Sequence, residues 1–306
     1  MSRKEEEILE KAVIQTTDLA NGGILNSAQS KEFYTNVVDE STFLKYARTI
    51  FMTSPAQEID KLNIGWRVAK SWTQATAPTS WDYVVPTTSK ISLTTSEIIV
   101  PWEISYDTLE DNIEWEKFAD TMLKMISTQF ANDLEELAID WDTTSLDTYL
   151  KLQNGIKKSI NGVSHVTVYS GNKVLSKDVF SDLLKSLPTK YRRNRKNLVY
   201  LVGSNAEQDY RDELTGRNTG LWDKSLTDSD NIGIFGIEIV PIPFLDDNTV
   251  ILTVKQNFIV WIHRKIRVER DQDILKRSYI FVITTRVGFA IEETDAVAYT
   301  KTLYTA

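Results

Sequence analysis

The longest uninterrupted pattern of apolar and polar positions lies between residues 112 and 141. Apolar side chains recur there every three to five residues, at Phe118, Met122, Met125, Phe130, Leu134, Leu137 and Trp141. No Gly or Pro interrupts the run, so it predicts one amphipathic helix with this stripe in the core. About 29 residues would span roughly 43 Å, far beyond the ~11–12-residue mean of globular helices. We expect a stiff rod.

Residues 49–110 have a different pattern, rich in Thr, Ser, Val, Ile and Trp. The runs 59–68 and 90–100 alternate and are β-branched, which predicts two long strands. Between them lies a polar stretch, 71–82, that contains tryptophans. An isolated two-stranded hairpin is only marginally stable in water, so something else must cover its large aromatic side chains. A neighbouring chain is the natural candidate for covering Trp66, Trp72 and Trp81.

The first 26 residues predict an arm with a short helical pattern. Glu5, Glu6, Glu7, Glu10 and Lys11 surround an apolar stripe of Ile8, Leu9, Ala12 and Val13. Gly22-Gly23 then breaks the pattern, and residues 27–48 recover a helical period.

Helices and strands alternate in the second half of the chain. Helical patterns cover 146–160, 176–187 and 204–214, and residues 215–233 form a polar loop. Leu198–Val202 is continuously apolar, as expected of a buried central strand. Further strands are predicted at 237–240, 250–254, 258–263, 266–269, 279–285 and 296–300. The chain is therefore of the α+β or mixed α/β class.

Composition excludes several function classes. The 306 residues include 35 Lys and Arg against 43 Asp and Glu, a net charge of −8, with no Cys and two His. Disulfides and thiolate metal sites are impossible. A net acidic chain is a poor general nucleic-acid binder, because phosphates require clustered cations. The start is charged and no stretch approaches ~18 apolar residues, so we expect neither a secretory signal nor a membrane span.

Searches for catalytic motifs find nothing. There is no phosphate-binding Gly-rich loop and no G-x-S-x-G turn. His165 and His263 are too far apart for an H-E-x-x-H zinc site, and each is better explained as a surface or interface group. The acidic residues Asp133, Glu136 and Asp140 are better explained as a solvated helix face than as a glycosidase pair. We predict no catalytic residue, no cofactor and no metal.

One cationic cluster stands apart: Lys190, Arg192, Arg193, Arg195 and Lys196, with Tyr191 among them. It would suit an inner-surface contact with nucleic acid or a contact with a partner. A solvated loop between helix and strand is the favoured interpretation, because the run is short and the chain is acidic.

The order of elements resembles the major capsid proteins of tailed bacteriophages, the Hong Kong 97 type of shell subunit. The resemblance covers nearly the whole chain and rests on five local phrases in this order. They are Gly22–Asn26 after the arm, the tryptophan hairpin before Val100–Ile104, the helix end Asn132–Ala138, Leu187–Arg193 before an apolar strand, and Gly236–Pro243 before further strands.

The resemblance implies a division of the chain. It assigns 1–48 to an N-terminal arm, and 49–110 to an extended β-hairpin loop with the first strands of a peripheral domain. It assigns 111–160 to a long spine helix in the peripheral domain, 161–262 to an axial domain, and 263–306 to return strands that complete the peripheral domain. Candidate contacts between subunits are then Trp66, Trp72, Trp81, Tyr83, Arg217 and Trp222.

The resemblance also implies function and partners. The chain would be the major capsid protein of a tailed double-stranded DNA phage, self-assembling into hexamers and pentamers of an icosahedral head. It would meet the portal protein and enclose DNA with weak, non-specific contacts, in a virion assembled in the host bacterial cytoplasm. Only ~20 residues precede Gly22-Gly23, too few for a scaffold domain, so a separate scaffolding protein is expected. An encapsulin-type nanocompartment is the alternative, and a carbohydrate-active enzyme is a remote one.

Overall fold

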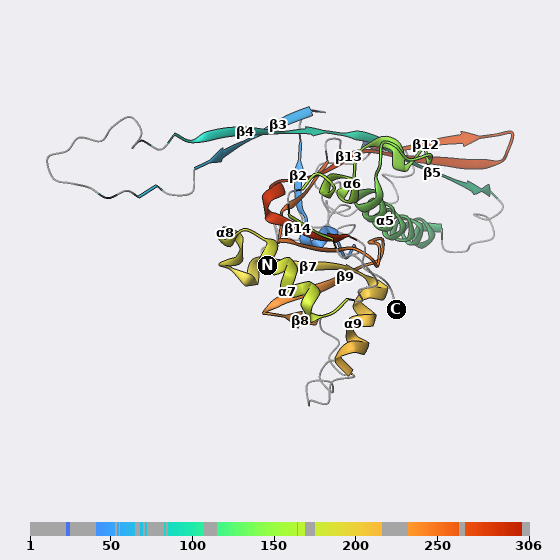
Figure 1. Cartoon of the computed structure of the whole chain (residues 1–306). Helices are drawn as coiled ribbons and strands as arrows, with labels where there is room; N and C mark the ends of the chain where they lie inside the picture. The colour runs from blue at the N-terminus through green and yellow to red at the C-terminus, as the bar shows by residue number, and fades with distance from the viewer. Residues whose placement is uncertain are drawn as a thin grey trace, which may run out of the picture.

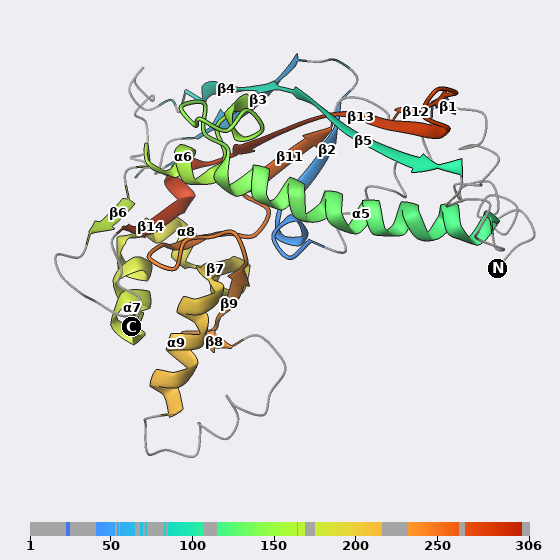
Figure 2. The same ribbon diagram turned by 90° about the vertical axis from the view of Figure 1, so that its right-hand side faces the viewer.

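The computed structural model describes residues 23–24, 41–52, 54, 56–64, 68–69, 71, 83, 85–106, 115–163, 165–168, 175–215, 232–262 and 267–301. They form two six-stranded sheets, a separate two-stranded hairpin and three longer helices. One sheet and the longest helix form one lobe of the molecule, and the other sheet forms a second lobe at an angle to it (Figure 2).

The first sheet is built around its longest strand, β13 (Ser278–Ile291). Its strand order is β1 (Gly23–Ile24), β12 (Arg267–Asp273), β13, β11 (Phe258–Ile262) and β2 (Arg48–Phe51), and β5 (Ser96–Ser105) also pairs with β13. The pairing of β5 with β13 is antiparallel and runs from Ser96↔Val287 to Ser105↔Ser278. On its other side, β13 pairs first with β12 and then, farther along, with β11.

The predicted long helix is α5 (Trp115–Asp140), which lies along the first sheet (Figure 2). Its C-terminal half is buried as expected: Phe130, Leu134 and Leu137 are at most 2% exposed. Just after the helix, Trp141 packs edge-on against Phe289 of β13, with ring centroids 5.3 Å apart.

The prediction that Met125 lies in the core is wrong, because Met125 is 62% exposed. Nine residues separate it from Leu134, and at about 100° per residue the two side chains point in opposite directions. The one five-residue spacing in the predicted stripe, from Met125 to Phe130, turns the side chain about 140° around the helix axis and so places Met125 on another face. The side chains of Phe118 and Met122 lie outside the described part of the chain.

The second sheet has the order β6 (His165–Val168), β14 (Val297–Lys301), β10 (Val250–Val254), β7 (Leu198–Gly203), β9 (Ile237–Ile242) and β8 (Gly233–Ile234). All residues of β7 are buried, as its apolar run predicted. Tyr200 packs in the cluster formed with α7 (Lys177–Ser186) and α9 (Ser204–Thr215), whereas Leu201 packs in the cluster that contains α5. The sheet is thus covered on both faces.

The predicted helix at 146–160 is wrong in its first half. The structure has a single 3-10 turn, η3 (Leu150–Leu152), and a five-residue helix, α6 (Ile156–Ile160). Asp147 Oδ1 accepts the Tyr149 N–H at 2.8 Å, a local bond that competes with helix formation. Gly155 then lies against the end of α5, where an added Cβ would sit 2.8 Å from the backbone nitrogen of Trp141.

The predicted strand 90–100 is two strands, β4 (Thr87–Thr94) and β5, with a break at Thr95. Sheet membership also departs from the division expected at residues 262 and 263. Strand β11 belongs to the first sheet and β14 to the second, because β11 pairs with β13 and β14 pairs with β10. The chain passes between the sheets at a tight turn after β10, which local patterning does not reveal.

Candidate assembly surfaces

The hairpin of β3 (Ala56–Asn63) and β4 is largely exposed and projects from the body (Figure 1). It pairs only with itself, from Ala56↔Thr94 to Asn63↔Thr87. Large apolar side chains stand in solvent along its far half: Leu62 is 75% exposed and Val85 76%. Ile64, Val68 and Tyr83 are also exposed. Such a surface is typical of a contact with another protein chain.

The root of the hairpin is firmly held. Leu93 and Met52 pack with Ile259 and Trp261 of β11 in a small core of their own. The Trp261 indole N–H donates to the Thr94 carbonyl at 2.9 Å. Gly288 leaves room for this indole, because an added Cβ would lie 2.4 Å from the Trp261 Nε1 atom. The hairpin is therefore anchored at its base and uncovered toward its tip.

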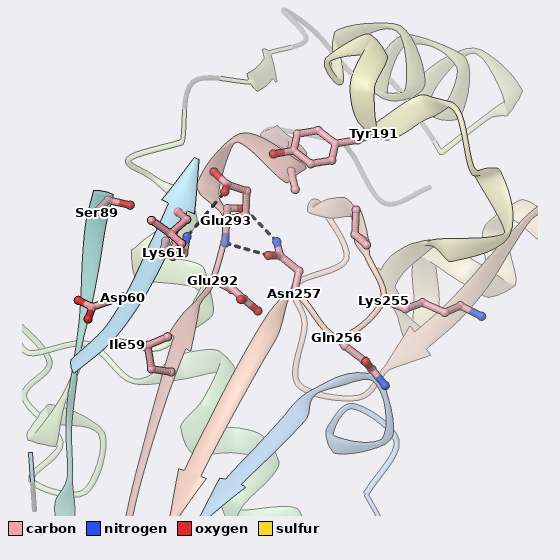
Figure 3. A pocket seen from close by; sticks show the side chains of 13 residues that line it. Ile59, Asp60, Lys61, Ser89, Tyr191, Lys255, Gln256, Asn257, Glu292 and Glu293 are labelled. Carbon is pink, nitrogen blue, oxygen red and sulfur yellow. Dashed lines mark hydrogen bonds and ion pairs between the residues drawn. The ribbon is translucent and has the colours of Figure 1, made fainter. Parts of the chain in front are cut away.

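A hollow of about 530 Å³ lies beside the middle and far half of the paired strands, between β3, the turn after β10 and the segment after β13 (Figure 3). Asn257 bridges to Glu293: its amide donates to the Glu293 carbonyl at 3.0 Å, and the Glu293 N–H donates back to Asn257 Oδ1 at 2.9 Å. Lys61 points into the hollow and lies 3.7 Å from the Glu293 carboxylate. One weak ion pair thus ties the hairpin to the body there.

A second projection is formed by β12 and β13, which leave the body on the side away from β3 and β4 (Figure 1). Its turn exposes Leu275 at 97% and Ile274 at 78%. Sequence reasoning did not identify this pair, although two adjacent apolar residues between Asp273 and Lys276 are an unusual turn composition. Farther along, Trp102 of β5 stacks on Phe281 at 5.1 Å and stiffens the strands.

The predicted cationic cluster lies on α8 (Thr189–Arg192), the turn η4 (Arg195–Asn197) and the link between them, and its side chains go to different places. Lys190 lies over the Tyr191 ring, 4.6 Å from its centroid. The hydrogen bond with Tyr191 raises the pKa of Lys190, and the nearby Glu293 and Asp295 carboxylates add to this. Arg192, Arg193 and Arg195 instead line a different hollow, with Lys185. Lys196 is exposed.

Of the predicted contact residues, Tyr83 is 65% exposed in the single chain, and its contact with another subunit stays a prediction. The other five, Trp66, Trp72, Trp81, Arg217 and Trp222, lie outside the described residues. His165 begins β6 and is half-buried, and His263 lies outside the described residues.

The acidic face of α5 is only partly solvated, unlike the prediction. Burial raises the pKa of Glu136, and the neighbouring carboxylates Asp140, Asp133 and Asp147 raise it further. Asp140 lies 2.6 Å from Lys157, so it is paired across to α6. The described ranges contain no cluster of three or more potential metal ligands, and no helix among them is long and apolar enough to cross a membrane.

A buried carboxylate, Glu135, joins α5 to the segment before β2. It is 3% exposed and accepts the Ser41 hydroxyl at 2.5 Å and the Thr42 N–H at 3.1 Å. The Ser41 oxygen in turn accepts the Leu44 N–H at 3.1 Å. These bonds hold the segment before β2 against α5.

Comparison with known proteins agrees with a shell subunit. No protein-family model matches the sequence. The chain is 34% identical over 307 residues to the Bacillus subtilis (strain 168) protein described as "Putative prophage capsid protein YqbE", covering 96% of this chain and 97% of that protein. The fold is similar to a chain of the satellite phage P4 procapsid, with a TM-score of 0.70 at 11% identity over 100% of this chain and 99% of that one.

Two further solved structures share the fold. A capsid chain of an empty GTA particle matches with a TM-score of 0.63 at 17% identity, over 87% of this chain and 90% of that one. The SrpI encapsulin of Synechococcus elongatus PCC 7942 matches with a TM-score of 0.57 at 10% identity, over 86% and 91%.

The two sheets, the long helix α5 and the projecting hairpin define the class of protein, a shell subunit with the Hong Kong 97-type capsid fold. The chain belongs to the family of prophage capsid proteins represented by its Bacillus subtilis relative. The predicted class and fold are thus confirmed, and the relative favours the capsid over the encapsulin alternative.

Proposed function

We propose that this chain is the major capsid protein of a tailed double-stranded DNA phage and builds an icosahedral head from hexamers and pentamers of itself. The observation that carries the proposal is the β3–β4 hairpin, with a fixed root and uncovered Leu62, Ile64 and Val85 toward its tip. Burying such side chains is favourable by roughly 25 cal/mol per Å². A neighbouring copy supplies the missing surface.

The expected division of labour gives each region a part in the shell. Residues 1–48 act as the arm, 49–110 as the extended loop with the first peripheral strands, and 111–160 as the spine region. An axial domain within 161–262 meets its symmetry mates, with the loop that holds Arg217 and Trp222 at its tip. Segment 263–306 supplies the return strands that complete the peripheral domain, except that β14 belongs to the second sheet.

The proposed partners follow from the same role. A portal protein occupies one vertex, a separate scaffolding protein guides assembly, and the finished shell encloses DNA without binding it tightly. Assembly takes place in the host bacterial cytoplasm. The role is structural, with no catalysis and no cofactor, and the full coverage of a capsid relative supports this over a carbohydrate-active enzyme.

Electron microscopy and sedimentation velocity of the purified full chain test the proposal. Closed shells, or rings of five or six subunits, are expected, alone or with the scaffolding protein co-expressed. A variant with Trp72→Ala and Trp81→Ala should keep the wild-type circular dichroism and lose particles. A chain that stays monomeric even with the scaffold contradicts the proposal. Shells that contain a cargo protein and no DNA favour the encapsulin alternative.

A further inference from the structure

A cationic hollow of about 470 Å³ lies between α7, α8 and the turn that joins β8 to β9. Lys185, Arg192, Arg193 and Arg195 stand around it, and Leu184 and Phe235 contribute apolar surface. No carboxylate is among the described residues that line it. Four cations around a partly apolar hollow suit a ligand that is both anionic and apolar.

Contacts among the described residues leave the charge of this hollow largely uncompensated. The Arg195 guanidinium donates to the Phe235 carbonyl at 3.2 Å, and the Arg192 guanidinium donates to the Thr189 hydroxyl at 3.0 Å. Both acceptors are neutral. Lys185 lies 3.7 Å from Asp182, an exposed pair that contributes little. Within the described chain, the Arg192 Nε atom is buried without an acceptor.

The β8–β9 turn that contacts Arg195 has a defined backbone conformation. Phe235 and Gly236 both have positive φ, 54° and 77°, in the two-residue connection of the β8–β9 hairpin. Tight hairpins prefer this conformation, but a bulky residue such as Phe adopts it unfavourably. The Phe235 side chain packs against the core cluster of α7 and α9. The carbonyl that orients Arg195 is therefore fixed by packing.

The apolar part of the hollow favours a peptide over nucleic acid. A phosphate backbone would pair with the guanidinium groups but would leave the partly exposed Phe235 without a matching surface. An acidic amphipathic peptide satisfies both parts, since its carboxylates pair with arginine and its aliphatic side chains cover the apolar floor.

We propose that this hollow receives the N-terminal segment Glu5–Glu10 of a neighbouring copy of the chain. The segment carries Glu5, Glu6, Glu7 and Glu10 around Ile8 and Leu9, and thus has both required properties. The inference rests on the proposed shell function, because only an assembly brings the two copies together.

The position of β1 favours the neighbour over the segment's own subunit. Strand β1 is the edge strand of the first sheet next to β12, and it lies on the side away from α8 (Figure 2). Residues 5–22 extend at most roughly 60–65 Å, at about 3.3–3.6 Å per residue. The arm therefore starts on the side of its own subunit away from the hollow, which favours a neighbouring copy as the donor of the segment.

A charge-swap experiment on the full chain tests the inference. Lys185→Glu with Arg193→Glu reverses two exposed cations of the hollow and leaves the Arg195–Phe235 contact intact. We expect roughly tenfold fewer particles by sedimentation velocity, because like charges then face the arm. Adding Glu6→Lys and Glu10→Lys to this variant should restore the yield. The matched control is Lys151→Glu with Lys177→Glu, two exposed cations elsewhere, which should assemble as the wild type does.

A carbodiimide crosslink gives a direct second measurement, because it couples a carboxylate to an amine in contact. Particles assembled from a mixture of unlabelled and ¹⁵N-labelled chains should give a Lys185 crosslink to a glutamate of segment 5–10, with one partner labelled and the other not. Crosslinks only within one chain would overturn the assignment to a neighbour.

The outcomes separate this inference from the proposed function. A wild-type chain that forms no particles contradicts the shell function itself. Particles that form in the wild type, with no rescue by the swap and no such crosslink, overturn only the inference. Normal yield of the Lys185→Glu, Arg193→Glu particles with less nuclease-protected DNA would instead make the hollow a nucleic-acid site and overturn the peptide.

Discussion

Strand β7 and the β3–β4 hairpin show opposite uses of similar side chains. In β7, Leu198, Val199 and Leu201 are at most 2% exposed, because a sheet neighbour lies on each side and helices cover both faces. In the hairpin, Leu62 and Val85 are at least 75% exposed, although the strands are just as well paired to each other. Backbone pairing alone therefore does not bury a strand.

The difference teaches where the fold ends and assembly begins. The burial of β7 is complete within one subunit, so its apolar side chains stabilise the fold. The far half of the hairpin gives its subunit little burial, and so its side chains are available to another chain. Mutations should therefore separate into those that unfold the subunit and those that affect only particles.

The largest expected effect comes from a charge in the core of α5. Leu134→Asp buries an unpaired carboxylate and should cost at least ~4 kcal/mol, enough to prevent soluble folding. Met125→Asp, on the opposite side of the same helix, should change the free energy of unfolding by about 0.5 kcal/mol or less. Urea unfolding followed by circular dichroism measures both. Equal loss in the two variants would show that the exposed face of α5 is misassigned.

A smaller effect separates the two ends of the hairpin. Leu93→Ala at the root should destabilise the subunit by roughly 2–5 kcal/mol, because it opens a cavity beside Trp261. Leu62→Ala toward the tip should leave the subunit within about 0.5 kcal/mol of wild type and still reduce particle yield. Thermal unfolding and sedimentation velocity together make the comparison. A normal yield of particles from the Leu62→Ala variant would show that this side chain is not part of the assembly surface.

The smallest expected effect is a pH dependence at the turn after α5. The Thr144 hydroxyl and N–H donate to Asp142 and, with Lys158, lower the pKa of its carboxyl to about 2 from an ordinary 3.8. A folded pKa below the unfolded one stabilises the fold above pH ~4 and ceases to do so as the pH falls toward ~2. The difference in melting temperature between wild type and Asp142→Asn should therefore narrow over that interval. A difference that is constant from pH 6 to 2 would exclude this linkage.

Much of the local structure follows from the sequence, because periodicity reports local burial. The rod at 115–140, the helices α7 and α9 and the buried strand β7 all lie within a few residues of their predicted positions. The failures at 146–155 have a local cause as well. The Asp147 side chain there accepts the backbone N–H of Tyr149, and a periodic pattern does not register such a bond.

The assembly surfaces were only partly predictable. The hairpin's need for a cover followed from its length and its aromatic residues, and the exposure of Tyr83 agrees with it. The exposed pair Ile274 and Leu275 was missed, since single apolar residues on a surface are common and carry no periodic signal. The split of the cationic cluster was also missed, because a short helix and a 3-10 turn send neighbouring residues to different faces.

The sequence by itself predicted the long helix α5, the helices α7 and α9 and the buried strand β7, and it shows that no cysteine chemistry is possible. Only the tertiary structure decided which strands pair. Strand β11 joins β13 and β14 joins β10, although β10 and β11 are separated by a turn of three residues. Apolar alternation states that a strand has a buried face, but the surface that buries it is chosen by side-chain packing between segments far apart in the chain.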